Sequence, residues 1–169
     1  MAVVVFLRGM NLGKRRITND DLVAVFKGAG YEGVSAYQAS GNIILGEADD
    51  ADETQISALL ADQLGYEVDA FVRTAARLET VATASPIDGR SGVAGGKPQI
   101  IFIKAGRDVD LPAVFPNDHE VHKIGDEIHW LPPAGLNELG NLHKAMDTAF
   151  GPATVRTLGT VQRLAKRIT

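Results

Sequence analysis

The 169-residue sequence contains no cysteine, only one tryptophan and no long hydrophobic run. The absence of cysteine excludes disulfides, cysteine nucleophiles and thiolate metal sites, and it is compatible with a reducing cytosol. The first apolar run covers only residues 2–7, which is too short for a signal peptide or a membrane span, and no later segment has 18 consecutive apolar residues. We therefore expect a soluble cytoplasmic protein with no membrane partner.

Charge is distributed unevenly along the chain, which carries a net charge of −4. Residues 1–40 have five basic and three acidic side chains, residues 41–70 have eight acidic and no basic ones, and residues 139–169 have five basic and one acidic. An acidic chain with basic ends disfavours a general nucleic-acid-binding domain, which is normally basic, but it leaves room for a local basic patch. The apolar content of 45% is sufficient for a hydrophobic core.

Hydrophobic periodicity predicts two successive sets of elements with the same order, βαββαβ followed by a helix. In the first set, Thr18 and Asp21 form a capping box at a helix start, and acidic residues 47–53 open the second helix. The first set comprises strands over 3–7, 34–37, 43–45 and 68–72, with helices over 18–30, 53–64 and from 74 onward. The second set comprises strands over 100–104, 120–124, 127–131 and 154–156, with helices over 108–115, 139–150 and 157–168.

Each set matches the split βαβ order of the ferredoxin-like fold. The tripeptide Val72-Arg73-Thr74 recurs as Val155-Arg156-Thr157, in both cases where a strand is followed by a helix. We therefore predict an α/β (α+β) protein made of two ferredoxin-like halves that arose by duplication. The glycine- and proline-rich residues 84–98 form the predicted joint, so the halves are residues 1–83 and 99–169.

The segment from Leu7 to Arg16 (LRGMNLGKRR) is the most informative part of the chain for function. A strand followed by a glycine-punctuated basic loop and a helix start is a common way to build an anion site. Gly9-x-x-x-Gly13-Lys14 is one residue shorter than a nucleotide-binding P-loop and lacks its serine or threonine, which disfavours nucleotide hydrolysis. The candidate anion ligands here are Arg8, Asn11, Lys14 and Arg15, with Arg16 beside them; the alternative is a loop whose charges are merely solvated.

Two further groups of residues are candidates for ligand binding. Arg73 and Arg156 occupy equivalent strand ends and could face a shared cleft with Arg8, or pair with the acidic segments 47–53 and 118–127. Thr74 and Thr157 are interpreted as helix N-caps. The second group, Tyr37, Ser40 and Asn42, flanks a tight turn, where turn chemistry is the main expectation and ligand contact the alternative.

The segments LRGMNLG (7–13), YQASGN (37–42) and RTA (73–75) resemble the uncharacterised bacterial family named domain of unknown function 1697. The resemblance implies a small α/β protein built from a duplicated ferredoxin-like unit, and it implies no activity, cofactor or partner. This sequence departs from the family pattern at Lys14, at Thr157-Leu158-Gly159 and at Asn141-Leu142-His143-Lys144. A site shared by the family and built from those positions would be altered here.

Other residues indicate no cofactor or metal. His119, His122, His129 and His143 lack metal-ligand spacing, and Gly95-Gly96-Lys97 precedes Pro98 and a strand, so it is interpreted as a linker. Trp130 is expected in the core or in edge-strand packing, with base stacking on an exposed sheet as the alternative.

The leading functional hypothesis is a binding module for a phosphorylated small molecule or a short nucleic acid. The alternatives are an enzyme acting on an anionic substrate, which the sequence neither establishes nor excludes, and a structural or partner-binding protein. No nucleophile–base pair is recognisable from spacing alone.

Overall fold

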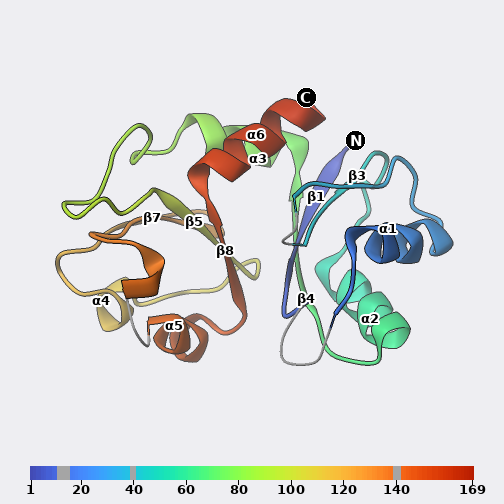
Figure 1. Ribbon diagram of the computed structural model, residues 1–169, viewed down its shortest axis with the longest axis horizontal. Helices are drawn as coiled ribbons and strands as arrows, with labels where there is room; N and C mark the ends of the chain where they lie inside the picture. Colours follow the sequence, from blue (N-terminus) through green and yellow to red (C-terminus); the bar gives the residue numbers. More distant parts are fainter. Residues whose placement is uncertain (11–15, 39–40, 139–141) are drawn as a thin grey trace. The chain divides into compact units, whose positions relative to one another are not determined.

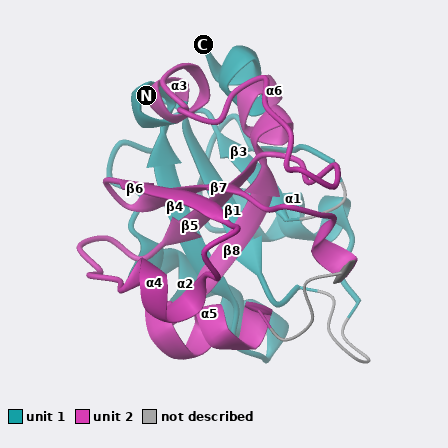
Figure 2. Cartoon of the chain, turned by 90° about the vertical axis from the view of Figure 1, so that its left-hand side faces the viewer, with its two compact units in different colours: residues 1–78, 164–169 teal, residues 79–163 magenta. Residues whose placement is uncertain are grey.

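The computed structural model describes residues 1–10, 16–38, 41–138 and 142–169. Two compact units are present: residues 1–78 with 164–169 form the first, and residues 79–163 form the second (Figure 2). The predicted joint over residues 84–98 belongs to the second unit. No helix in the described part of the chain is long and apolar enough to cross a membrane.

The first antiparallel sheet has the strand order β2-β3-β1-β4 (Figure 1). Its strands and the helices connected to them are β1 (Val3–Arg8), α1 (Asn19–Gly28), β2 (Ser35–Ala36), β3 (Asn42–Leu45), α2 (Glu53–Leu64), β4 (Asp69–Thr74) and α3 (Ala75–Thr83). The predicted capping box at Thr18 is confirmed, because the Thr18 hydroxyl accepts from the Asp21 N–H and the Asp21 side chain accepts from the Thr18 N–H. Helices α1 and α2 cover one face of this sheet (Figure 1).

The core of the first unit lies between that sheet face and the two helices. Val3, Val5 and Leu7 alternate along β1 with the two-residue period of a strand, and all three are buried. They pack with Leu22 and Phe26 of α1 and with Ile56 and Leu60 of α2, and all four of these side chains are buried. The predicted buried strand over 3–7 is confirmed, and Val4 and Phe6 between these residues are buried as well.

The second antiparallel sheet has the strand order β6-β7-β5-β8, which repeats the order of the first. The elements of the second half of the chain are β5 (Gln99–Ile103), α4 (Leu111–Val114), β6 (Glu120–Ile124), β7 (Glu127–Leu131), a 3₁₀ turn (Leu136–Glu138), α5 (Leu142–Phe150), β8 (Ala153–Thr157) and α6 (Leu158–Ile168). Trp130 is fully buried beside Phe115, with ring centroids 5.4 Å apart. Its predicted core position is confirmed, and the base-stacking alternative is wrong.

Helix α4 is shorter than the predicted span 108–115. Pro112 is tolerated only in the first turn of a helix, so the helix begins at Leu111. Phe115 is extended (φ −98°, ψ 128°) because it precedes Pro116, and a residue before proline is driven away from helical angles. The two prolines thus limit the helix to four residues.

Residues 92–96 fold back on the chain through backbone hydrogen bonds. The Gly92 N–H donates to the Gly96 carbonyl at 2.8 Å, and the Ala94 N–H donates to the Pro133 carbonyl at 2.7 Å. A Cβ at Gly92 or Gly96 would overlap the Pro132 carbonyl oxygen. Glycine is therefore required at both positions by the close approach of the two backbones.

Candidate functional site

The basic loop proposed from the sequence is only partly described. Asn11, Lys14, Arg15 and Ser40 lie outside the described residues. Arg8 is half-buried at the end of β1, opposite Asp69 of β4 in the strand register. The Leu7 N–H donates to the Gly41 carbonyl at 2.8 Å, so the end of β1 lies beside the turn that precedes β3. Two candidate segments far apart in the sequence, around Arg8 and around Tyr37, are thereby neighbours.

Tyr37 and Asn42 close that turn. The Tyr37 N–H donates to the Asn42 carbonyl at 2.9 Å, and the Asn42 side-chain amide donates to the Tyr37 carbonyl at 3.0 Å. Asn42 is only 1% exposed, which matches the expected turn role. The guanidinium of Arg167 lies 5.6 Å from the centroid of the Tyr37 ring, within the range of a cation–π contact.

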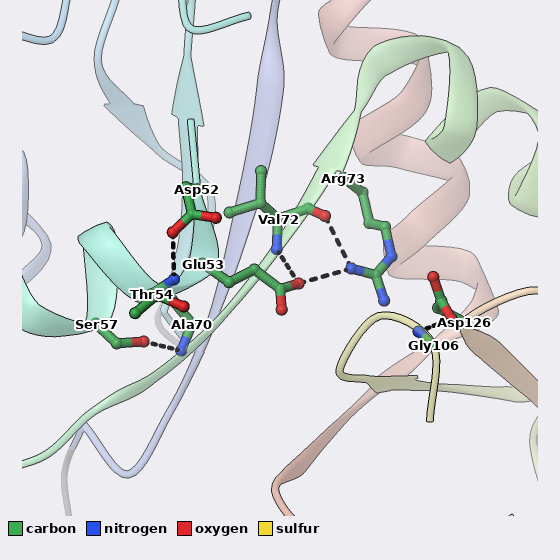
Figure 3. A network of polar contacts seen from close by, with 9 residues as sticks. All are labelled: Asp52, Glu53, Thr54, Ser57, Ala70, Val72, Arg73, Gly106 and Asp126. Atoms are coloured by element: carbon green, nitrogen blue, oxygen red, sulfur yellow. Dashed lines mark hydrogen bonds and ion pairs between the residues drawn. The ribbon is translucent and has the colours of Figure 1, made fainter. Parts of the chain in front are cut away.

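Arg73 forms an ion pair with Glu53 (Figure 3), and both side chains are largely buried. Its Nη1 lies 3.0 Å from the Glu53 carboxylate and donates to the Val72 carbonyl at 2.8 Å. The same Glu53 oxygen accepts from the Val72 N–H at 3.0 Å. The sequence offered pairing with the acidic residues 47–53 as one alternative for Arg73, and that pairing is confirmed.

Arg156 donates to groups on its own strand. Its Nη1 lies 2.7 Å from the Thr154 hydroxyl and 2.9 Å from the Val155 carbonyl. Burial lowers the pKa of the Arg156 guanidinium to about 10, because desolvation disfavours its charged form. Arg73 and Arg156 thus share one feature, a bond to the carbonyl of the preceding residue.

The two predicted threonine caps are confirmed. Thr74 Oγ1 accepts from the Arg77 N–H and Thr157 Oγ1 accepts from the Thr160 N–H, both at 3.2 Å. These bonds satisfy N–H groups in the first turns of α3 and α6, which have no partner within the helix.

A pocket of about 370 Å³ lies within the second unit, at the start of α6. Three parts of the chain line it: the loop after α3, the segment entering β5, and the junction between β8 and α6. The lining residues are Asp88, Gly89, Arg90, Lys97, Pro98, Thr157, Leu158, Gly159, Gln162 and Arg163. The volume is in the range of small-molecule sites.

Basic side chains outnumber acidic ones in this pocket, since Arg90, Lys97 and Arg163 face a single acid, Asp88. Arg90 is engaged with Glu120 through two hydrogen bonds of 2.7 and 2.6 Å. Across the described residues, the Lys97 ammonium has no hydrogen-bond or ion-pair partner. Such a lining favours an anionic ligand.

The chain is similar to known proteins in two of three comparisons. Residues 1–128 match the family described as "Protein of unknown function (DUF1697)". The chain belongs to this family. No match is found among curated proteins. The chain is also similar to a solved structure, "The structure of conserved bacterial protein SP0830 from Streptococcus pneumoniae", with a TM-score of 0.76 and 17% identity over 99% of this chain and 97% of the other. At that identity the likeness shows the fold alone.

The DUF1697 match includes only part of the pocket lining. Asp88, Gly89, Arg90, Lys97 and Pro98 lie within the matched residues 1–128, whereas the residues at the start of α6 lie beyond them. The family resemblance is therefore confirmed without assigning a role to this pocket.

Sequence reasoning missed the pocket. The sequence predicts a linker at Lys97, and Arg163 is an exposed residue of an amphipathic helix. One sequence feature could have indicated the pocket: the basic residue Arg163 follows one turn after the capped helix start at Thr157-Leu158-Gly159.

A serine–histidine contact was missed as well. The Ser85 hydroxyl lies 2.8 Å from Nδ1 of His129, which is 1% exposed. The two residues are 44 positions apart, so spacing could not reveal them. Within the described residues there is no group of three or more metal-ligating side chains.

Proposed function

We propose that this protein is a binding module for a phosphorylated small molecule or a short nucleic acid, with its principal anion site in the pocket at the start of α6. The observation that carries the proposal is the pocket of about 370 Å³ in which Lys97 and Arg163 lie with one carboxylate, Asp88, while Arg90 is paired with Glu120. A local excess of positive charge in a chain of net charge −4 concentrates attraction for an anion at one place.

The chemistry of the lining supports a phosphate group in particular. Arg163 offers a planar set of donors and Lys97 a point charge, the two basic groups that proteins use most for phosphate. The same pocket includes Gly159 in the first turn of α6, where the helix dipole adds a further favourable contribution for an anion. No metal ion is required for this type of recognition.

We retain the basic loop of the first unit as a second proposed location. Its residues are Arg8, Asn11, Lys14 and Arg15 of the loop with Tyr37, Ser40 and Asn42 of the neighbouring turn. Arg73 of the first unit belongs to the same proposed set, and Arg156 of the second unit is a separate proposed anion ligand. Their hydrogen bonds to Glu53 and to Thr154 would have to be exchanged for bonds to the ligand.

The proposal includes an internal duplication of a ferredoxin-like unit. Its support is that Val3 pairs with Thr74 as Gln99 pairs with Thr157. The Ala75 N–H donates to the Ala2 carbonyl as the Leu158 N–H donates to the Pro98 carbonyl. Agreement in strand order, register, cap and hydrogen bond is what a duplication produces.

An enzyme acting on an anionic substrate is the second candidate function. One observation favours it: the Ser85 hydroxyl lies within hydrogen-bond distance of the buried His129 imidazole, the relation of a nucleophile to its base. An active-site-directed fluorophosphonate tests this candidate. Labelling of the wild-type chain that is lost in both Ser85→Ala and His129→Gln would support it, and absence of labelling would remove it.

A thermal-shift assay with orthophosphate, sugar phosphates and short RNA tests the binding function. A ligand at about 100 times its dissociation constant stabilises the folded chain by roughly 2.7 kcal/mol. From the dependence of the melting temperature on ligand concentration, we expect an apparent affinity at least ten-fold weaker in the double variant Lys97→Gln with Arg163→Gln. The control is Lys166→Gln, which removes one positive charge from the same helix outside the pocket and should behave as wild type.

Two other results separate the alternatives. Loss of binding in Arg8→Gln with Lys14→Gln, but not in the pocket variants, would move the site to the first unit. Shifts that disappear equally at 0.3 M salt in every variant would indicate a charged surface without a specific site.

A further inference from the structure

The pocket at the start of α6 contains a pair of hydrogen-bond acceptors beside its basic residues. The Gln162 side-chain amide donates to a carboxylate oxygen of Asp88 at 2.9 Å, and it also lies 3.4 Å from the Ala82 carbonyl. Both Asp88 and Gln162 line the pocket. The pair is formed between the loop after α3 and the second turn of α6.

The chemistry of this pair determines which atoms remain for a ligand. A carboxylate only accepts hydrogen bonds, so the group of Gln162 that faces Asp88 must be its NH₂. The Gln162 carbonyl oxygen and the second Asp88 oxygen are then left as acceptors, and across the described residues neither has another hydrogen-bond partner. Two acceptors next to each other bind donor groups such as adjacent hydroxyls.

A carboxylate also disfavours a ligand that carries only negative charge. Orthophosphate or pyrophosphate would gain from Lys97 and Arg163 but would be repelled by Asp88. A ligand with an anionic end and a hydroxyl-bearing end uses both parts of the lining. Its size must also suit a pocket of about 370 Å³, which accommodates one small molecule more readily than a polynucleotide.

We propose that the pocket binds a phosphorylated sugar or polyol, with the phosphate at Lys97 and Arg163 and the hydroxyls at Asp88 and Gln162. This inference rests on the proposed function, because it names the ligand class of the same site. A short nucleic acid, which offers several phosphates along a track, becomes the less favoured ligand.

Isothermal titration calorimetry on the full chain tests the inference with three probes: ribose 5-phosphate, orthophosphate and ribose. We expect ribose 5-phosphate to bind at least ten-fold more tightly than orthophosphate, because hydrogen bonds to a charged acceptor add to the phosphate contacts. Ribose alone, without the anionic end, should bind weakest of the three.

The variant Asp88→Asn provides the decisive comparison. Its carbonyl still accepts from Gln162, while the second acceptor becomes a donor. Removal of a negative charge favours the phosphate of both ligands, so we expect orthophosphate binding to stay equal or rise. Only ribose 5-phosphate also loses hydrogen bonds to a charged acceptor, so its affinity relative to orthophosphate should fall about ten-fold. Retained orthophosphate binding also shows that the variant is folded.

The outcomes distinguish the two proposals. Equal affinities of wild type for ribose 5-phosphate and orthophosphate, or an Asp88→Asn variant that weakens both ligands equally, would overturn the inference and leave anion binding in place. Tighter binding of short RNA than of any sugar phosphate would also overturn it. No binding of any phosphate would overturn the proposed function together with the inference.

Discussion

The buried ion pair between Arg73 and Glu53 should contribute measurably more to stability than the exposed pair between Arg90 and Glu120. The Arg73 and Glu53 side chains retain 7% and 18% of their exposure, against 49% and 34% for Arg90 and Glu120. Water screens the second pair far more than the first, even though its distance of 2.6 Å is shorter than the 3.0 Å of the buried pair.

The magnitude for the buried pair follows from its geometry. Two unit charges 3.0 Å apart attract by roughly 5 to 6 kcal/mol at an effective dielectric constant of about 20. Desolvation of both groups offsets most of this attraction. Contacting charged residues typically show a coupling free energy of about 0.5–3 kcal/mol, and we expect the Arg73–Glu53 pair to lie in that range.

A double-mutant cycle measures the coupling free energy directly. The substitutions are Arg73→Met, which keeps an apolar chain, and Glu53→Gln, which keeps an acceptor for the Val72 N–H. Urea unfolding of the wild type, both single variants and the double variant, followed by far-UV circular dichroism, gives the four free energies of unfolding. The same cycle with Arg90→Met and Glu120→Gln is the matched control. A coupling free energy below about 0.5 kcal/mol for the buried pair would refute the reasoning from burial. A coupling free energy of the exposed pair that equals or exceeds that of the buried pair would refute it as well.

Three further predictions concern the cap, a glycine contact and pH. Thr74→Ala should lower the free energy of unfolding by about 1 kcal/mol in urea titrations, whereas Thr74→Ser keeps the cap and should change it little. Gly92→Ala should lower the free energy of unfolding by roughly 1–3 kcal/mol, because the new Cβ would overlap the Pro132 carbonyl oxygen. The Cβ of Gly28→Ala would meet nothing within 4 Å, so this variant should not be destabilised. Equal melting temperatures of the two variants would contradict the prediction. Arg90, with a smaller effect of His122, lowers the pKa of Glu120 from 4.5 to about 2. The Glu120 carboxylate therefore contributes its full stabilisation above pH 4.5 and loses it as the pH falls through 2, and solvent screening of this exposed pair keeps the contribution small. The stability difference between wild type and Glu120→Gln in urea should therefore be larger at pH 7 than at pH 2.5, and a pH-independent difference would contradict it.

Most of the secondary structure could be predicted from the sequence because local signals and packing agree. Thr18 and Asp21 form the cap that their spacing indicates, and the predicted strands over 120–124 and 127–131 are confirmed as β6 and β7, with Ile124 opposite Glu127. Helix α4 is the exception: its prolines are visible in the sequence, but their restrictive effect outweighed the apolar pattern over 108–115.

The candidate site was less predictable, because its residues meet only through the fold. Lys97 and Arg163 are 66 positions apart in the sequence, and Asp88 and Gln162 are 74 apart. Charge alone did not distinguish Arg73, whose guanidinium forms a buried ion pair with Glu53, from Lys97, whose side chain lines a pocket. The hydrogen-bond and ion-pair partners of a side chain are set by distances in the folded structure, and these distances cannot be derived from residue spacing along the chain.

Amide chemical-shift mapping during a phosphate titration tests the location of the anion site most directly. On a ¹⁵N-labelled sample of the full chain at low ionic strength, orthophosphate should shift the backbone amides of Gly89, Gly159 and Arg163 with one common saturation curve. In the Lys97→Gln variant the same shifts should require at least several-fold more phosphate. Saturable shifts confined to the segments around Arg8 and Tyr37, or no saturable shift anywhere, would contradict an anion site at the start of α6.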